Sequence, residues 1–362
     1  MAEPFKNLFN EVLIDNVAAS LVKHCPDFDA MAFKSSVFDA HWQQRELKDR
    51  IYHIATSMQP LLPSDYAQAV AILQLAGAAF SGVEYLIFPA YVELFGLDDY
   101  EPSVKALEVM TPYSSSELAV RPFIIRYGDR MMTQMERWAE SENEHVRRLA
   151  SEGCRPRLPW AMALPGFKRD PGAVLNIIEK LMDDKSEYVR RSVANNLNDI
   201  SKDNPDVLID LLHKRLGKNS RTDWILKHAS RSLLKQGDSQ VLQRFGFSDP
   251  EHVKAANLEV DQNVAIGKQL AFSFQLQTTD RELGKLRIEY AIDFMKANGR
   301  QARKIFKVSE ADYADTTKTV AKTHSFKLIT TRRYYPGRHD LAVIVNGKQL
   351  ASEAFELLAE QP

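Results

Sequence analysis

The chain has 362 residues, more than the roughly 250–300 at which a single hydrophobic core stops growing, so two domains or a repeat array are expected. Apolar and charged contents of 44% and 26% exclude a disordered chain, and two cysteines, expected to be reduced, exclude a small disulfide-stapled domain. The formal charge of −1 conceals a segregation, since residues 121–236 hold 22 Lys and Arg against 16 Asp and Glu while residues 1–120 hold 7 against 16, which favours a central surface that faces a polyanion.

The N-terminal part of the chain predicts amphipathic helices. Residues 1–20 lack the basic-then-apolar order of a signal peptide, so we expect a cytoplasmic protein. Two helices joined by a turn are predicted from apolar residues at helical spacing, with Pro63 and Ser64 opening the second: Leu47, Ile51, Ile54 and Met58, then Ala67, Val70, Leu73 and Ala76. Polar residues interrupt the apolar stretch after Asp65, which favours buried helices over a membrane span.

A repeated helix follows. EHVRRLASE (144–152) aligns with EYVRRSVANN (187–196) at a spacing of 43 residues, and WILKHASRSLL (224–234) is a weaker copy 36 residues further on. This period is typical of HEAT or armadillo helix pairs, which stack into a curved array. We therefore expect a HEAT-like helical-repeat solenoid over residues 1–245.

The pattern changes to a period of 2 beyond a linker expected at residues 238–252. LAFSFQL, LRIEYAIDF, ARKIFKV, HSFKLI, HDLAVIV and a last strand near 350–358 predict about seven strands over 253–362, with Asn346-Gly347 as a hairpin turn. This is the strand number of an all-β Ig-like sandwich without its Cys…Trp…Cys hallmark, and Tyr334 or Tyr335 stands where a tyrosine corner would. The expected fold class is thus mostly α, with an Ig-like sandwich at the C-terminus.

The sequence lacks the common catalytic motifs HExxH, paired CxxC, GxGxxG, GxxxxGK[ST] and GxSxG, so we expect no cofactor and no metal. Polar and aromatic residues instead gather where the repeat helices end. The loop after Glu152 carries Arg155, Arg157 and Trp160 between prolines. Guanidinium groups suit phosphates, and an indole stacks on a sugar or a base.

Each of these residues also has a plain structural interpretation. Glu152 pairs with Arg155 in that interpretation, and Trp160 fills a gap between layers. Asp199, one repeat further on, caps the next helix, and Glu117 stabilises a helix N-terminus. Three carboxylates in a basic groove would repel phosphates, however, which is the reason to expect that they face a developing cation.

At these residues the chain resembles the AlkC group of bacterial DNA alkylation repair glycosylases, HEAT-repeat relatives of AlkD. The resemblance covers residues 5–240 and is carried by RELKDRIYHIATSMQPLLPSDYAQAV, ELAVRPFI, EHVRRLASEGCRPRLPWA and VRRSVANNLNDISKDNP. It implies base excision repair: hydrolysis of the N-glycosidic bond of cationic alkylated bases, such as 3-methyladenine or 3-methylcytosine, in duplex DNA. We also expect a cytoplasmic monomer that is associated with the nucleoid.

The resemblance further implies a catalytic set of Glu117, Glu152, Asp199 and Trp160, with Trp160 on the deoxyribose. Phosphate-binding candidates are the cations of the same stretch: Arg155, Arg157, Arg190, Arg191, Lys202, Lys227 and Arg231. Cations of the sandwich are expected to contact DNA as well, namely Lys285, Arg303, Lys304, Arg332 and Arg333. Two alternatives stay open at this point: a non-enzymatic HEAT scaffold, and a protein that binds distorted DNA without chemistry.

Overall fold

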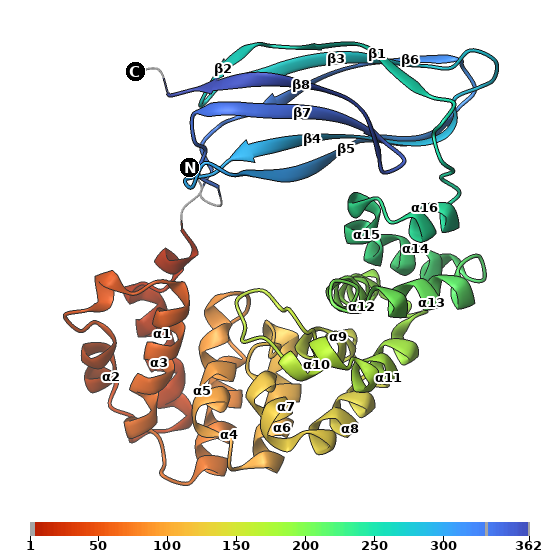
Figure 1. The fold of residues 1–362 in the computed structure, drawn as a ribbon. Coiled ribbons are helices and arrows are strands. Elements are labelled where there is room, and N and C mark those ends of the chain that lie inside the picture. Colours follow the sequence, from red (N-terminus) through yellow and green to blue (C-terminus); the bar gives the residue numbers. More distant parts are fainter. Residues whose placement is uncertain (1–3, 330–331, 361–362) are drawn as a thin grey trace. The chain divides into compact units, whose positions relative to one another are not determined.

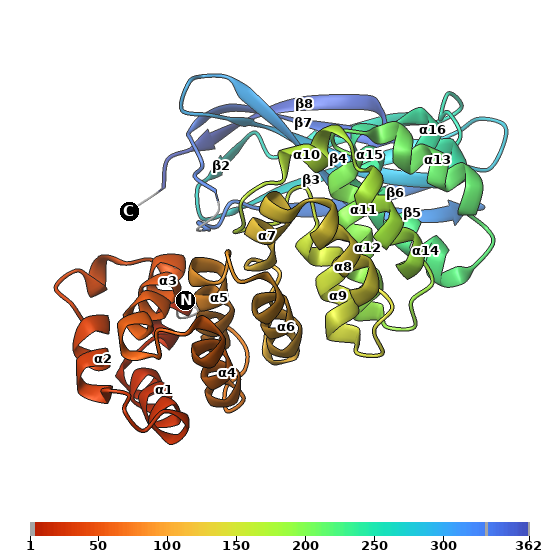
Figure 2. The ribbon, with the colours of Figure 1, turned by 90° about the horizontal axis from the view of Figure 1, so that it is seen from below.

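The computed structural model describes residues 4–329 and 332–360, which form two compact units, Met1–Ala229 and Ser230–Pro362. The first unit is helical, and its helices follow one another in chain order (Figures 1 and 2). Their bounds are η1 Phe5–Leu8, α1 Glu11–His24, α2 Ala30–Val37, η2 Trp42–Gln44, α3 Leu47–Met58, η3 Gln59–Leu61, α4 Tyr66–Gly77, η4 Glu84–Leu86, α5 Ile87–Phe95, α6 Tyr100–Met110, η5 Thr111–Tyr113, α7 Val120–Tyr127, α8 Asp129–Trp138, α9 Glu144–Gly153, α10 Pro165–Arg169, α11 Gly172–Leu181, α12 Glu187–Ile200, α13 Pro205–Arg215 and α14 Ser220–Ala229.

Side-chain caps explain where several of these helices begin. Asn10, Asp29 and Asp65 accept hydrogen bonds from the backbone N–H groups of the first turns of α1, α2 and α4, at 3.1, 2.9 and 2.8 Å. Each satisfies a donor that has no partner within its helix. The helix pair predicted from Leu47 onward is confirmed as α3 and α4, although Asp65, and not Ser64, caps the second helix.

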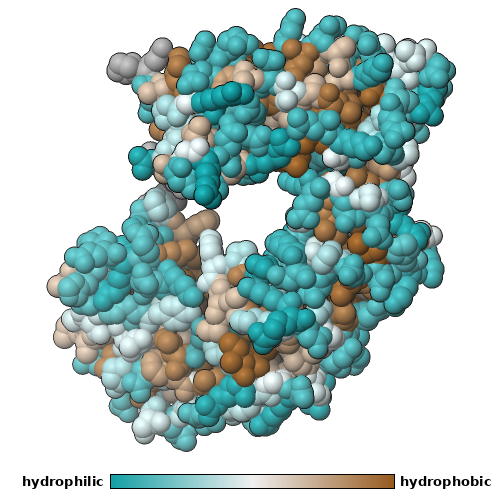
Figure 3. All heavy atoms as spheres, in the orientation of Figure 1, coloured by the Kyte–Doolittle hydropathy of each residue, from teal (hydrophilic) through white to brown (hydrophobic). Residues whose placement is uncertain are grey.

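The repeat predicted from sequence is confirmed as a stack of α9, α12 and α14, in which α12 contacts both of the others. Val146, Val189 and Ile225 hold equivalent positions in the repeat and are 3%, 0% and 0% exposed. The same apolar position therefore faces the core in each copy. Hydrophilic side chains cover most of the face seen in Figure 3.

A second feature of the repeat is an arginine that braces the preceding turn. Nη1 of Arg147 donates to the carbonyls of residues 141–142 at 2.9 and 2.8 Å. Nη1 of Arg190, 43 residues on, donates to those of residues 184–185 at 2.8 and 2.9 Å. Both satisfy carbonyl groups ahead of a repeat helix.

The second unit begins with α15 (Arg231–Gln236) and α16 (Ser239–Arg244) and continues as a two-sheet sandwich. The strands are β1 Lys254–Val260, β2 Asn263–Ala265, β3 Gln269–Gln277, β4 Gly284–Met295, β5 Gln301–Tyr313, β6 Thr317–Ser325, β7 Gly337–Val345 and β8 Lys348–Leu358. One sheet has the order β1-β3-β6 and the other β2-β8-β7-β4-β5, with β2 and β8 parallel and the other pairs antiparallel. The helical repeat followed by an Ig-like sandwich is therefore confirmed.

One detail of the sandwich differs from the sequence-based prediction, and another agrees with it. HSFKLI was predicted as a strand, but β6 ends at Ser325, and the strand is the threonine-rich segment before it. Val320 and His324 point inward from β6 while most of its other side chains are exposed, so its alternation has few apolar residues to reveal it. The Asn346-Gly347 turn is confirmed, with φ of +46° and +80° in the left-handed region that such a hairpin requires.

The two short helices at the start of this unit pack on that hairpin. Backbone of Gly237 approaches Gly347 so closely that a Cβ built on Gly347 would lie 2.7 Å from the Gly237 Cα. Asn346 adds a hydrogen bond to the carbonyl of Ser248 at 2.8 Å. Contacts thus group α15 and α16 with the sandwich. The domain bounds expected from sequence, 1–245 and 253–362 with a linker over 238–252, remain a prediction.

Candidate active site

Three acidic residues predicted from sequence lie at the ends of neighbouring helices of the first unit. Glu152 is in the last turn of α9 and Asp199 in the last turn of α12, where they are 5% and 1% exposed. Glu117 lies in the turn before α7. The C-terminal end of a helix carries partial negative charge, so buried carboxylates at two such ends require cations beside them.

Arg155 supplies a cation to two of these carboxylates. Its Nη1 donates to Glu152 Oε1 at 2.5 Å, and its Nε and Nη2 lie 2.9 and 2.8 Å from Asp199 Oδ2. Burial lowers the pKa of Arg155, but Glu152 and Asp199 outweigh that effect and raise it. Arg155 is only 7% exposed and its nitrogens bond two carboxylates, which favours a buried counterion over the phosphate ligand predicted from sequence.

Arg148 extends this arrangement to the third carboxylate. It donates to Glu117, which also accepts from the Ser115 hydroxyl, and its Nη2 lies 3.8 Å from Glu152 Oε1. Burial lowers the pKa of Arg148, and the neighbouring carboxylates raise it above its usual range. At the other end, Lys202 Nζ lies 2.9 Å from Asp199 Oδ1.

Charges of opposite sign therefore alternate along one continuous chain of side chains. We call this chain the carboxylate–cation ladder, and its members are Glu117, Arg148, Glu152, Arg155, Asp199 and Lys202. A hydroxyl also contributes, because Ser192 donates to Glu152 Oε2 at 2.6 Å. The three carboxylates are thus held in fixed geometry by several charge-assisted hydrogen bonds.

The plain structural interpretation of these residues is right at one position and wrong at two. Glu152 does pair with Arg155. Asp199 is not a helix cap, since it lies inside α12. Trp160 fills no gap between layers, because it is 66% exposed. It lies in a loop and has a backbone φ of +65°.

The remaining predicted phosphate ligands differ in their surroundings. Arg157 is 39% exposed and makes a two-point ion pair with Asp203 at 2.9 and 2.6 Å. Arg191, on the exposed side of α12, pairs with Glu187 one turn before it. Arg190 braces a turn and lies 5.9 Å from the Trp224 ring, which supports a structural role over the predicted phosphate role. Lys227 lies in α14, and Arg231 begins α15 in the second unit.

Arg148 and Tyr188 are site residues that the sequence analysis did not single out. The Arg148 guanidinium lies 4.8 Å from the Tyr188 ring centre, and Tyr188 is 40% exposed. Burial raises the pKa of the Tyr188 phenol, Arg148 opposes the shift, and Glu117 and Glu152 add to it. The repeated VRR motif could have pointed to Arg148. The first arginine of the motif, Arg147, braces the preceding turn, which leaves the second arginine, Arg148, for another role.

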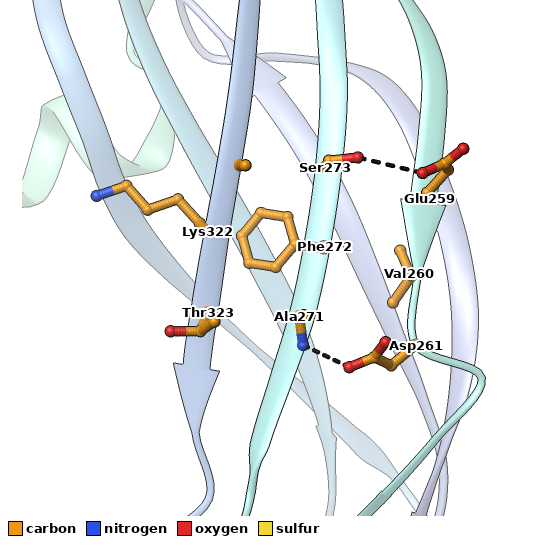
Figure 4. Close-up of a pocket in the computed structure, with 9 residues that line it drawn as sticks. Glu259, Val260, Asp261, Ala271, Phe272, Ser273, Lys322 and Thr323 are labelled. Carbon is orange, nitrogen blue, oxygen red and sulfur yellow. Dashed lines mark hydrogen bonds between the residues drawn. The ribbon is translucent and has the colours of Figure 1, made fainter.

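A groove of about 650 Å³ lies elsewhere, on the three-stranded sheet of the second unit (Figure 4). Asp261 accepts a hydrogen bond from the backbone N–H of Ala271 at 2.7 Å. The Ser273 hydroxyl donates to Glu259 Oε2 at 3.5 Å. These acids are occupied in holding the edge of the sheet. Among the described residues, no group of three or more His, Cys, Asp and Glu is arranged to hold a metal ion.

Comparison with known proteins identifies the family. A family model described as DNA alkylation repair enzyme matches residues 113–233, and one described as the C-terminal Ig-like domain of uncharacterised protein YhaZ matches residues 254–359. The chain is 44% identical over 354 residues to uncharacterized protein YhaZ of Bacillus subtilis (strain 168), covering 97% of this chain and 99% of the relative. Alkylpurine DNA glycosylase AlkC of Pseudomonas fluorescens, solved bound to DNA containing an abasic site analog, matches with a TM-score of 0.94 and 36% identity over 99% of this chain and 100% of that chain. This chain belongs to the AlkC group.

Membership of the AlkC group confirms the resemblance seen in the sequence. The segment matched by the alkylation repair model contains Glu117, Glu152, Asp199 and Trp160, whereas the second half of α15 and all of α16 lie between the two matched segments. Within the described part of the chain, no helix combines the length and apolar character needed to span a bilayer.

Proposed function

We propose that this AlkC-group protein hydrolyses the N-glycosidic bond of cationic alkylated bases, of the 3-methyladenine and 3-methylcytosine type, in duplex DNA. The observation that carries the proposal is the carboxylate–cation ladder, which holds three carboxylates at fixed positions next to the loop of the exposed Trp160. The proposal is also supported by the similarity to the solved AlkC, an alkylpurine DNA glycosylase bound to DNA containing an abasic site analog.

Hydrolysis of this N-glycosidic bond does not require a strong acid to protonate the leaving base. A base alkylated on a ring nitrogen already carries positive charge and leaves readily, so the enzyme has to stabilise a developing oxocarbenium-like sugar and position a water molecule. Carboxylates perform both tasks in glycoside hydrolysis. Preorganisation matters here, because charges that are already fixed need no rearrangement during the reaction.

The exposure of the three carboxylates divides their roles. The side chain of Glu117 is 19% exposed, against 6% for Glu152 and 2% for Asp199. We therefore assign Glu117 to contact with the sugar or the attacking water. Glu152 and Asp199 contribute negative potential from behind it, and Arg148 and Arg155 keep the three groups in place.

Trp160 and five cations, of which Lys227 and Arg231 are half-buried and the others exposed, are assigned to DNA. The indole is proposed to pack on the deoxyribose of the lesion, because a flat aromatic face contacts a sugar without requiring a particular base. Arg157, Arg191, Lys202, Lys227 and Arg231 are proposed to contact phosphates, and Arg155 is withdrawn from that set. The protein is proposed to act as a monomer in the cytoplasm, on nucleoid DNA.

Base release is the experiment that tests this function. Full-length protein is incubated with methylated duplex DNA, and the liberated bases are separated by chromatography. Release of free 3-methyladenine that is lost in Glu117→Gln supports the proposal. Binding of methylated duplex without release of any base favours the alternative of a protein that recognises distorted DNA, and absence of both favours a scaffold.

A further inference from the structure

The loop that presents Trp160 has an unusual backbone. Trp160 has φ of +65°, in the left-handed region that a large side chain adopts only where its surroundings hold it. Its indole is exposed, so core packing of this side chain does not supply the restraint. Contacts to the loop backbone must therefore do so.

Arg121, on α7, fixes both ends of this loop. Its Nη1 donates to the Gly153 carbonyl at 2.8 Å and its Nε to the Met162 carbonyl at 2.7 Å. The residue is 0% exposed, and burial lowers its pKa to about 10. A buried guanidinium bonded to two carbonyl groups is costly to keep, which indicates that the loop requires it.

Lys48 bonds the loop between these two points, at Trp160 itself. Its Nζ donates to the Trp160 carbonyl at 3.1 Å, across 112 residues of sequence. The ammonium also lies 5.2 Å from the ring centre of Tyr52, one turn along α3. The Tyr52 hydroxyl in turn lies 2.9 Å from each carboxylate oxygen of Glu93, to which it donates. Burial raises the pKa of Glu93, while Tyr52 and Lys48 oppose that shift.

We propose that Lys48 is a positioning residue that keeps Trp160 in the conformation in which its indole meets the DNA. This inference rests on the proposed glycosylase function for its consequence in excision, but the contact itself does not depend on chemistry. It gives the acidic N-terminal helices a part in the site, since Lys48 joins α3 to a loop that begins at the end of α9.

The test compares Lys48→Met with Lys105→Met in full-length protein. Both lysines are exposed, and Lys105 is paired with Glu108 on α6. The indole N–H signals of the four tryptophans are recorded by NMR, and the Trp160 signal is identified by its loss in Trp160→Phe. Lys48→Met is expected to shift or broaden the Trp160 signal and to leave the thermal midpoint unchanged, whereas Lys105→Met changes neither. A Trp160 signal that Lys48→Met leaves in place overturns the proposal.

Excision of 3-methyladenine under single-turnover conditions provides the second measurement. Lys48→Met is expected to slow excision about tenfold, with partial rescue in Lys48→Arg, whose guanidinium can also donate to the carbonyl. In a Trp160→Ala background the same substitution should have no further effect. Equal slowing in both backgrounds overturns the role through Trp160. If the wild type releases no base while the Trp160 signal still responds to Lys48→Met, the proposed function fails and the positioning contact stands.

Discussion

Arg155 and Asp199 form a buried two-contact ion pair, in which Nε and Nη2 of the guanidinium lie 2.9 and 2.8 Å from a single carboxylate oxygen. The third nitrogen of the same guanidinium bonds Glu152. Arg155 thus connects the C-terminal ends of α9 and α12. Removing the guanidinium should mainly lower the stability of the fold, whereas neutralising one of the carboxylates should mainly lower the rate of excision.

Arg155→Ala is expected to destabilise the protein by about 3–5 kcal/mol, because it leaves two buried carboxylates without their shared cation. Arg157→Ala, at an exposed ion pair, should change stability by less than about 1 kcal/mol. Thermal or chemical denaturation measures both. Equal stability of the two variants would contradict the burial of the Arg155 pairs.

Arg157→Ala is expected to weaken binding to duplex DNA and to reduce the salt dependence of log K by about 0.9, the value for one lost phosphate contact. The measurement is a titration of binding at several salt concentrations. Lys105→Met, an exposed lysine on α6, serves as the control. An unchanged slope would remove Arg157 from the DNA interface.

Glu152→Gln and Asp199→Asn are expected to slow excision by about 10²-fold or more while DNA affinity is kept or slightly increased, because negative charge near phosphates is lost. Single-turnover excision and equilibrium binding are measured on the same preparations. Glu140→Gln, at an exposed pair with Lys180, is the matched control. A parallel loss of rate, affinity and thermal midpoint would instead indicate a structural role.

Much of the fold could be predicted because it depends on local pattern. The repeat spacing placed Val146 and Val189 in the core, and Asn346-Gly347 predicted a turn whose two positive φ angles are local properties. Strand β6 was misplaced because its inward positions hold one valine and one histidine, so little apolar alternation marks it.

The candidate site was harder to predict because its contacts join distant segments. Motif matching found the three carboxylates, but it could not show that Arg155 faces two of them and not solvent. The bond from Lys48 to Trp160 spans 112 residues and leaves no trace in local spacing. Such contacts depend on how whole helices pack, which periodicity does not specify.

Gly347→Ala tests the packing of α15 and α16 on the β7–β8 hairpin. An added Cβ would meet the Gly237 Cα at 2.7 Å and Leu242 Cδ1 at 2.9 Å, in addition to the cost of φ at +80°. Gly299→Ala, with φ of +74° and nothing within 4 Å, carries the backbone cost alone, about 1–2 kcal/mol. Chemical denaturation should show the larger loss for Gly347→Ala, and equal losses would contradict the close approach.

Acid should destabilise the sandwich through His324. Burial, together with Arg332 and Lys304, lowers the pKa of His324 to about 4, from 6.5 in the unfolded chain. The folded state therefore favours the neutral ring, so this stability is present above pH 6.5 and is lost as pH falls towards 4, to a total of about 3 kcal/mol. Burial also lowers the pKa of His339, with the same sign. Unfolding measured from pH 7.5 to 4 should be less pH-dependent in His324→Gln, and an unchanged profile would exclude His324 as a cause.

The second unit is expected to be required for excision although the carboxylates and Trp160 all lie in the first. Bending duplex DNA by 40–90° costs on the order of 1–6 kcal/mol, which added contacts must offset. Cations of the sandwich are expected to contribute such contacts, but Arg303 is paired with Asp293 and Arg332 lies 4.6 Å from the Phe294 ring.

Because α15 and α16 pack on the sandwich, the informative truncation ends at Ala229, between the compact units, and not near residue 245. The shortened chain should keep its helical circular dichroism and lose most excision and much of its affinity for duplex DNA. Full activity in this truncation would show that the helical unit is sufficient and that the sandwich serves another purpose.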